Sequence, residues 1–380
     1  MRIALSNSSF HWGGLHVVTE LLASGLLARG HEVVVLGRPG SPLEVRMRGI
    51  VPFEGISRGI DLSPKAMMRA TAAMRRHRTQ VVLALTKKDV RVTVPVAWAM
   101  KIPSVVRYEN DRGPGAGIYD RVFFGKLPVR HVATSEATKK TLLASAPWIQ
   151  PDSVDVIYNG IDPKPFEESA RADLGIPADA IAIGFVGRLE KRKGLLDLAA
   201  AWRLIAARIP NGHLIIAGTG PAEAEARRIL GTADRVHWLG FRKDVPSILR
   251  RLDLLAVPSH WEGFGLVAAE ALLAETPVVA ANASSLPEII TDAIHGLLVP
   301  RSDPESLARA IIGAVKNPVR SSRMAAAGRA RVLADFSAEA MIDRYEKTLA
   351  EVIGTNKYNA KMQSMHGFAA LAVNILLQTG

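Results

Sequence analysis

The chain has 380 residues, which at about 150 residues per domain predicts two domains. Hydrophobic residues make up 48% and charged residues 22% of the sequence, and this balance excludes a chain that is disordered throughout. The sequence contains no cysteine, which excludes disulfides, thiolate zinc sites and cysteine nucleophiles. No apolar run reaches the roughly 18 residues of a membrane span, and the first apolar run is too short for a signal peptide, so we expect a cytoplasmic protein.

Positive charge is concentrated in the first half of the chain. The formal net charge is +12 at pH 7, of which residues 1–160 carry +10 and residues 161–380 carry +2. This asymmetry indicates an anionic partner, such as a phospholipid surface, a phosphorylated acceptor or nucleic acid. A solvated basic surface explains the same charge equally well. Nucleic acid is disfavoured because no basic patch carries interleaved aromatic residues.

Short apolar runs alternate with helical periodicity along the chain, which predicts an α/β fold with parallel strands covered on both faces. The turn signals of segment 155–169 place a domain boundary there. Two such series imply two doubly wound Rossmann-like domains facing each other across a cleft, with ligands at the carboxyl ends of the strands. The expected helices are 15–28 and 337–353, and the expected strands are 2–5, 32–36, 81–85, 104–108, 131–134, 182–187, 213–218, 236–240, 254–259 and 277–281.

The segment 259–281 carries the most chemical information. Glu262 precedes the turn Gly263-Phe264-Gly265 and a helix, and Glu270 lies eight residues further on in an otherwise apolar helical stretch. Glycines leave the amides of a helix N-terminus open to an anion, and a carboxylate on an apolar helix needs a partner that a hydroxyl-rich ligand would supply. An internal salt bridge or an exposed helix face would account for Glu270 alone.

Two further loops follow predicted strands. Arg188 and Lys193 lie in the basic loop of segment 185–194, where a guanidinium fork and a mobile ammonium could neutralise a diphosphate; a solvated basic loop is the alternative. Gly13-Gly14 follows the first strand. It is not G-x-G-x-x-G, which argues against dinucleotide binding, but it leaves open amides before a helix.

In their order along the chain, these segments resemble a retaining glycosyltransferase of family 4 with the GT-B fold. The resemblance implies a hexosyl- or related glycosyltransferase that moves a sugar from a nucleotide-diphosphate sugar to a cell-envelope glycan or glycolipid, in polysaccharide or lipopolysaccharide biosynthesis. It implies no cofactor and no metal, and the sequence contains no Asp-x-Asp. The segments that carry the resemblance are Gly13-Gly14, RGHEV (29–33), NGID (159–162), VGRLEKRKG (186–194), AGTGP (217–221), the E-x7-E pair Glu262 and Glu270, PVVA (277–280) and LPEII (286–290).

The resemblance also assigns domains and roles by position. Residues 1–165 would form the acceptor-side domain and 166–336 the nucleotide-sugar-binding domain, and the helix and tail over 337–380 would return to the first domain. The predicted catalytic residues are those that would hold the donor diphosphate, Arg188 and Lys193, and the residue that would hold the sugar hydroxyls, Glu262. The predicted donor-binding residues are Gly13, Gly14, Gly265, Leu266, Val267 and Glu270, of which Glu270 would hold the ribose.

One position departs from the family pattern. Many members carry a histidine after a strand like 104–108, where this chain has Tyr108-Glu109-Asn110-Asp111. Glu109, Asp111 or His11 would contact the sugar or acceptor instead, which puts the usual sugar preference in doubt.

The segment 62–79 has the composition of a membrane-surface helix. Met67, Ala70 and Met74 form an apolar stripe among five basic residues, as in an interfacial amphipathic helix. The resemblance to glycosyltransferases of lipid-linked acceptors implies peripheral association with the inner face of the membrane. The alternative is a surface helix whose stripe faces the core. The five basic residues are Lys65, Arg69, Arg75, Arg76 and Arg78.

Two other functions remain compatible with the two-domain pattern. A sugar-nucleotide 2-epimerase-like isomerase would need additional acid and base residues, and the Glu262–Glu270 segment argues against it. A non-catalytic sugar-nucleotide-binding protein would bind the nucleotide sugar without releasing nucleoside diphosphate.

Overall fold

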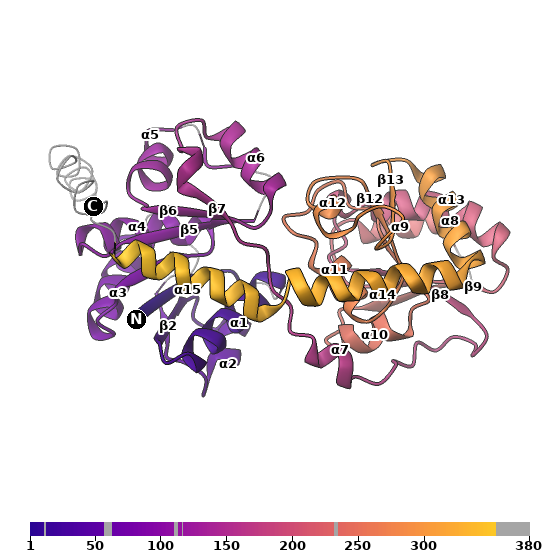
Figure 1. Cartoon of the computed structure of the whole chain (residues 1–380), viewed down its shortest axis with the longest axis horizontal. Helices are drawn as coiled ribbons and strands as arrows, with labels where there is room; N and C mark the ends of the chain where they lie inside the picture. Colours follow the sequence, from indigo (N-terminus) through magenta and orange to yellow (C-terminus); the bar gives the residue numbers. More distant parts are fainter. Residues whose placement is uncertain (11–12, 57–62, 110–112, 116, 232–234, 355–380) are drawn as a thin grey trace. The chain divides into compact units, whose positions relative to one another are not determined.

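The computed structural model describes residues 1–10, 13–56, 63–109, 113–115, 117–231 and 235–354. His11, Asp111 and the tail beyond residue 354 therefore lie outside the described residues. The chain forms two compact units (Figure 1). Of the described residues, the first contains those of 1–134, 138–158 and 339–354, and the second contains those of 135–137 and 159–338.

The first unit is built on a seven-stranded parallel sheet with the order β3-β2-β1-β4-β5-β6-β7. The order reverses between β1 and β4, so the loops after these two strands border the crevice where ligands of such sheets bind. Gly13 and Gly14 come after the loop that follows β1, and Gly14 is the first residue of α1. The strands are β1 (Arg2–Asn7), β2 (Glu32–Gly37), β3 (Phe53–Gly55), β4 (Val81–Ala84), β5 (Ser104–Tyr108), β6 (Arg130–Ala133) and β7 (Val154–Val156).

Several helices of the first unit begin at side chains that satisfy their first amides. Thr86 accepts a hydrogen bond from the amide of Asp89, and Ser63 accepts one from Ala66, as N-cap residues do. The helices are α1 (Gly14–Ala28), α2 (Pro42–Met47), α3 (Pro64–Arg76), α4 (Lys87–Ala99), α5 (Ile118–Asp120), α6 (Glu136–Ser145), of which residues 138–145 belong to this unit, and α15 (Ala338–Gly354), with a π-helical turn over Arg121–Lys126.

Helix α15 belongs to the first unit although it follows the second in sequence. A Cβ on Gly25 of α1 would lie 2.2 Å from Cδ1 of Ile342, so glycine permits the close approach of these helices. Arg29 pairs with Asp343 and with Glu346, at 2.5 and 2.6 Å. The apolar contact fixes α15 against α1, and the ion pairs at its margin add less, because exposed pairs contribute at most about 1 kcal/mol.

The apolar stripe of the predicted membrane-surface helix lies in the core. Ala70 and Met74 are fully buried in a cluster with residues of β1, β2, β4 and α4, and Met67 packs against it. The structure therefore has the alternative arrangement, a surface helix whose stripe faces the core, because α3 covers the sheet with its apolar side. Lys65, Arg69 and Arg75 remain exposed. Among the described residues, no helix is long and apolar enough to cross a membrane.

The second unit contains a six-stranded parallel sheet with the order β10-β9-β8-β11-β12-β13. The order reverses between β8 and β11, so the loops after these strands share one edge. The strands are β8 (Ile181–Val186), β9 (Gly212–Ala217), β10 (Val236–Gly240), β11 (Leu254–Val257), β12 (Val278–Ala281) and β13 (Leu297–Val299). The helices are α7 (Lys164–Glu168), α8 (Leu195–Arg208), α9 (Glu223–Leu230), α10 (Val245–Arg251), α11 (Leu266–Leu273), α12 (Leu286–Ile289), α13 (Pro304–Lys316) and α14 (Pro318–Asp335).

Helices α8 and α13 bury their apolar sides on one face of this sheet. Leu198 and Trp202 of α8 and Ile311 of α13 form a cluster with alternating residues of the strands, such as Ile183 and Ile216. This packing fixes the strand ends from which the loops of the candidate site emerge.

Candidate functional site

A backbone hydrogen bond joins the loops after β8 and β11, which the sequence predicted as two separate segments. The amide of His260 donates to the carbonyl oxygen of Arg192 at 2.8 Å. Gly194 has φ 73°, and a Cβ there would lie 1.9 Å from the carbonyl oxygen of Pro258. Only glycine allows this approach, which places Lys193 directly beside the end of β11.

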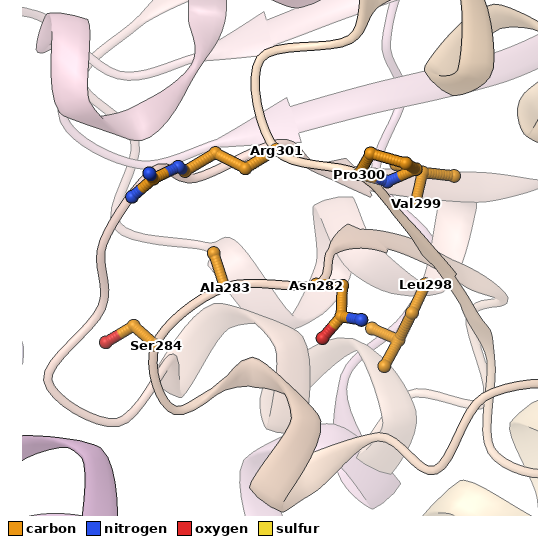
Figure 2. Close-up of a pocket in the computed structure, with 7 residues that line it drawn as sticks. All are labelled: Asn282, Ala283, Ser284, Leu298, Val299, Pro300 and Arg301. Atoms are coloured by element: carbon orange, nitrogen blue, oxygen red, sulfur yellow. The ribbon is translucent and has the colours of Figure 1, made fainter.

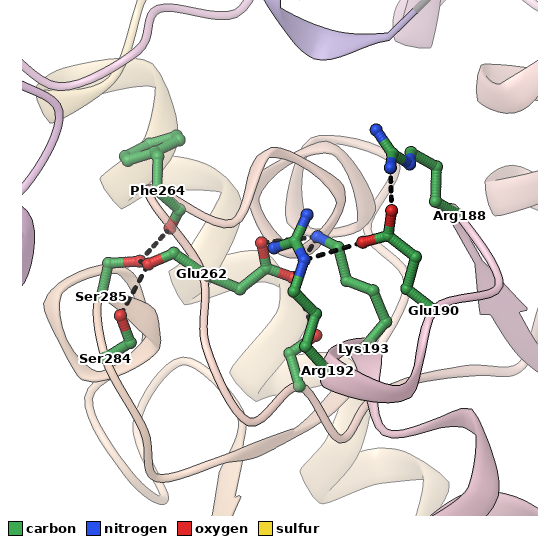
Figure 3. Close-up of polar contacts among 9 residues, drawn as sticks. Arg188, Glu190, Arg192, Lys193, Glu262, Phe264, Ser284 and Ser285 are labelled. Atoms are coloured by element: carbon green, nitrogen blue, oxygen red, sulfur yellow. Dashed lines mark hydrogen bonds and ion pairs between the residues drawn. The ribbon is translucent and has the colours of Figure 1, made fainter. Parts of the chain in front are cut away.

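Lys193 and Glu262 form the centre of the site (Figure 3). The Lys193 ammonium lies 2.7 Å from each carboxylate oxygen of Glu262. The Lys193 side chain is 20% exposed and that of Glu262 only 6% exposed. A pair this sheltered from water is screened weakly by salt, so each charge holds the other in place.

Three serines hold the Glu262 segment. Ser259 donates to Oε1 of Glu262 at 2.8 Å, and the Ser284 hydroxyl donates to the main-chain carbonyl oxygen of Glu262 at 2.6 Å. The Ser285 hydroxyl lies 3.1 Å from that oxygen and 2.8 Å from the carbonyl oxygen of Phe264 (Figure 3). Sequence analysis missed these serines. The spacing Ser259-x-x-Glu262 was the only available signal, since Ser284 and Ser285 come from the loop after the neighbouring strand.

Arg188 lies in the same loop as Lys193 but is more exposed. Its guanidinium contacts the Glu190 carboxylate, which also pairs with Arg192 at 2.7 Å (Figure 3). Partial burial, together with the charge of Arg192, lowers the pKa of Arg188 from its ordinary value. Two cations thus share one carboxylate, and an incoming anion would relieve their repulsion.

The glycine-rich turn after β9 acts as a support for this loop. Gly218 has φ 141°, and a Cβ there would lie 1.8 Å from the carbonyl oxygen of Gly187. The amide of Leu189 donates to the carbonyl oxygen of Thr219 at 3.0 Å. The turn 217–221 therefore fixes the start of the loop that carries Arg188.

The N-terminus of α11 provides amides at the same edge of the sheet. Gly265 is its N-cap with φ 97°, and no side chain among the described residues caps the helix. Leu266 and Val267 are its first two residues, and neither has a hydrogen bond from its amide among the described residues. Such amides attract an anion.

Glu270 lies one turn further along α11. Its carboxyl group has no hydrogen-bond or ion-pair partner among the described residues, and burial raises its pKa to about 7. A half-buried carboxyl group without a partner among the described residues is a candidate for ligand contact.

The residues predicted in the first unit are placed differently. Gly14 begins α1, and no side chain caps that helix at Gly13. A Cβ on Gly13 would meet no atom of the described residues within 4 Å, so none of them excludes a larger side chain there. Glu109 forms an ion pair with Arg107 at 2.8 Å, and the Arg107 side chain is fully buried. Glu109 thus balances a buried cation in this structure.

The second unit therefore brings Arg188, Lys193 and the open amides of α11 to one sheet edge, with two carboxyl groups among them. Cations and amides can stabilise a developing anion such as a diphosphate leaving group, while carboxylates can accept hydrogen bonds from hydroxyls. Within the described ranges, no three His, Cys, Asp or Glu side chains are grouped as metal ligands would be.

Comparison with known families assigns both halves of the chain. Residues 166–331 match the model described as glycosyl transferases group 1, and residues 12–164 match the model described as glycosyltransferase family 4. Together the two matches span most of the chain and place it among the glycosyltransferases. The first match contains Arg188, Lys193, Glu262 and Glu270, and the second contains Gly13 and Gly14.

Curated relatives match part of the chain. A D-inositol 3-phosphate glycosyltransferase of Saccharomonospora viridis is 33% identical over 226 residues, which cover 54% of this chain and 52% of the relative. An alpha-maltose-1-phosphate synthase of Mycolicibacterium smegmatis is 30% identical over 250 residues, or 58% of this chain and 63% of the relative. The chain spans about half to two thirds of the length of these relatives.

Solved structures confirm the predicted GT-B fold. HepE of Anabaena, solved in complex with UDP, has a TM-score of 0.79 at 21% identity and covers 92% of this chain and 100% of its own. WaaG, a glycosyltransferase involved in lipopolysaccharide biosynthesis, has a TM-score of 0.69 at 17% identity over 91% of this chain and 99% of its own.

Proposed function

We propose that this glycosyltransferase transfers a sugar from a nucleotide-diphosphate sugar to an acceptor, with retention of anomeric configuration and without a metal. The observation that carries the proposal is the Lys193–Glu262 pair at the carboxyl edge of the second sheet, beside Arg188 and the open N-terminus of α11. Because HepE was solved with UDP-glucose, a uridine diphosphate sugar is the first donor to test.

The proposed mechanism separates charge along the anomeric bond. As this bond breaks, negative charge grows on the diphosphate and positive charge on the sugar. Arg188, Lys193 and the amides of Leu266 and Val267 would stabilise the diphosphate, which replaces the charge that a metal would supply. Glu262 would accept hydrogen bonds from the sugar hydroxyls, and the departing phosphate would take the proton of the acceptor. Retention in this scheme needs no enzymic nucleophile.

The remaining donor contacts are proposed for each unit by itself. Glu270 would accept hydrogen bonds from the ribose, and its carboxyl group has no competing partner among the described residues. Gly13 and Gly14 would let the substrate approach the backbone after β1. The ion pair of Glu109 with Arg107 argues for a supporting role at most in sugar contact.

We propose a cell-envelope glycan or glycolipid as the acceptor, reached by peripheral docking of the first unit on an anionic bilayer. The exposed charges of α3, Lys65, Arg69 and Arg75, support an electrostatic contact. Insertion of apolar side chains from this helix is not part of the proposal, because Ala70 and Met74 are buried.

A second candidate acceptor is a small phosphorylated polyol or sugar. The names of two relatives, D-inositol 3-phosphate glycosyltransferase and alpha-maltose-1-phosphate synthase, favour this class. The net charge of +10 over residues 1–160 suits either acceptor.

Product mass spectrometry tests the proposal and separates the acceptors. The full chain is incubated with a panel of nucleotide sugars and either envelope lipid extract or inositol phosphate. Nucleoside diphosphate release with a sugar-bearing product in one mixture is the expected result. An isomerised nucleotide sugar without release would indicate the epimerase-like alternative, and an unchanged panel would indicate a binding protein.

A further inference from the structure

His260 joins the two loops that carry Lys193 and Glu262, both through its main chain and through its ring. Its amide donates to the carbonyl oxygen of Arg192, directly before Lys193, at 2.8 Å. Its ring nitrogen Nε2 lies 2.6 Å from Oδ2 of Asp197, four residues after Lys193. The two contacts therefore lie on either side of Lys193 in the chain, and Glu262 follows His260 by two residues.

The ring contact is a hydrogen bond to a carboxylate that is partly sheltered from water. The side chain of His260 is 34% exposed and that of Asp197 is 20% exposed. A carboxylate only accepts hydrogen bonds, so Nε2 carries the hydrogen of this bond. Hydrogen bonds to an ionised group are about twice as strong as neutral ones, and partial burial limits their screening by salt. The bond therefore restrains the start of α8, of which Asp197 is the third residue, against the loop after β11.

Ser302 also approaches His260, but in a geometry that does not activate a nucleophile. Its hydroxyl lies 3.4 Å from Nε2, the same nitrogen that bonds Asp197. A histidine that activates a serine uses one ring nitrogen for the serine and the other for the carboxylate. Ser302 is exposed and directly follows Arg301, one of the residues around the pocket between the loops after β12 and β13 (Figure 2). The arrangement of these side chains therefore suits positioning rather than nucleophilic catalysis.

The backbone contacts between the two loops act before the first turn of α8. The amide of His260 and the close approach of Gly194 to the end of β11 both hold the main chain ahead of this turn. The His260 ring reaches into the turn itself, through Asp197. Lys193 lies directly before the N-cap of α8, so a shift of this turn would move the ammonium relative to its carboxylate partner. Misplacement of a reacting centre by about 1 Å can lower turnover roughly hundredfold.

We propose that His260 and Asp197 are positioning residues for the contact of Lys193 with the second phosphate of the donor diphosphate. Their hydrogen bond fixes the first turn of α8 and thereby the Lys193 ammonium beside Glu262, and neither residue touches the donor. This role rests on the proposed binding of a nucleotide-diphosphate sugar, whereas the contacts that join the two loops do not.

Calorimetry of nucleotide binding tests the proposal without requiring transfer. The full chain is titrated with the diphosphate and the monophosphate of uridine, guanosine and adenosine. The ratio of the two affinities for one nucleoside reports the contact with the second phosphate, which a general loss of stability does not change. His213→Ala is the matched control, because the His213 ring also makes one short contact, 2.8 Å to His237, but at the start of β9, the opposite edge of the sheet.

We expect the preference of the wild type for the diphosphate to fall at least about fivefold in His260→Ala. His260→Gln should regain most of the preference, because its side-chain amide can donate to Asp197, and His213→Ala should keep all of it. Asp197→Ala removes the same bond from the other side and should lower the preference as much as His260→Ala. The double variant should lower it no further, since the two residues act through one bond.

The outcomes separate this inference from the proposed function. A wild type that binds no diphosphate more tightly than its monophosphate would overturn the proposed donor site and this inference with it. A wild type with the preference, together with an unchanged preference in His260→Ala and Asp197→Ala, would overturn the positioning role alone. A loss in His213→Ala as large as in His260→Ala, or a His260→Gln variant no better than His260→Ala, would also overturn it.

Discussion

Replacing Lys193 and Arg188 by alanine separates the structural from the catalytic contribution of the basic loop. Lys193 is the ammonium partner of a Glu262 side chain that is 6% exposed, whereas the Arg188 side chain is 64% exposed. Lys193→Ala leaves the Glu262 carboxylate with the Ser259 hydroxyl but without its cation. Arg188→Ala leaves Glu190 paired with Arg192.

The two variants should differ in stability but resemble each other in turnover. An uncompensated buried charge costs about 3 kcal/mol at the lower end of the range, which for a unit of this size lowers Tm by about 6–12 °C. Loss of an exposed ion pair costs at most about 1 kcal/mol, which lowers Tm by no more than about 4 °C. Turnover should fall by about 10²–10³ in both variants, because each loses one stabiliser of the leaving diphosphate.

Thermal unfolding and nucleoside diphosphate release at saturating donor provide the two readouts. Lys193→Ala combined with Glu262→Gln should regain most of the lost Tm without regaining turnover, since the buried charge is then removed. Equal Tm values for Lys193→Ala and Arg188→Ala would refute the assigned pairing. Near-normal turnover of folded Arg188→Ala would refute its diphosphate role.

Three further predictions concern other parts of the chain. Because burial raises the pKa of Glu270 to about 7, affinity for UDP should fall by up to about tenfold per pH unit below 7, and the free energy of unfolding should decrease as pH rises from about 4.5 to 7. Calorimetry should show the first dependence and denaturant titration the second, and both should be lost in Glu270→Gln. A wild type whose affinity and stability do not depend on pH would contradict the assignment. Gly194→Ala should destabilise the fold, because its Cβ would lie 1.9 Å from the Pro258 oxygen. Gly13→Ala should have the Tm of the wild type but a lower turnover. Equal Tm values for the two variants would refute the steric argument. Binding of the protein to anionic vesicles should disappear at high salt, and each of Arg69→Ser and Arg75→Ser should weaken it by roughly 1 kcal/mol. Vesicle co-sedimentation measures this binding, with Arg320→Ser as the control. A wild-type protein that stays in the supernatant at low salt would exclude α3 as a docking face.

Sequence patterns predicted the long central strands, while the short edge strands went unrecognised. β3, β7 and β13 have three residues each and lie at the ends of their sheets. Three residues are too few to show a period, and an edge strand needs less apolar character than a central one. The sequence also could not decide whether the apolar stripe of α3 packs on the sheet or contacts a membrane, because both surfaces are apolar.

The candidate site was predicted in its residue types but not in its pairing. Strand-loop-helix order placed Arg188 and Lys193 near Glu262, because neighbouring loops of a doubly wound sheet share one edge. That Lys193 contacts both oxygens of Glu262 depends on the tertiary contact between Gly194 and Pro258. Ser284 and Ser285 follow another strand, and no sequence signal linked them to the site.

The anomeric configuration of the product tests the proposed transfer most directly. Proton NMR of one reaction mixture follows the anomeric signal of an α-linked donor, the free nucleoside diphosphate and the anomeric signal of the product. A site that stabilises the leaving diphosphate and supplies no nucleophile should give free nucleoside diphosphate together with an α-linked product, and Arg188→Ala should slow both signals equally. A β-linked product, or an isomerised donor without free nucleoside diphosphate, would contradict this account.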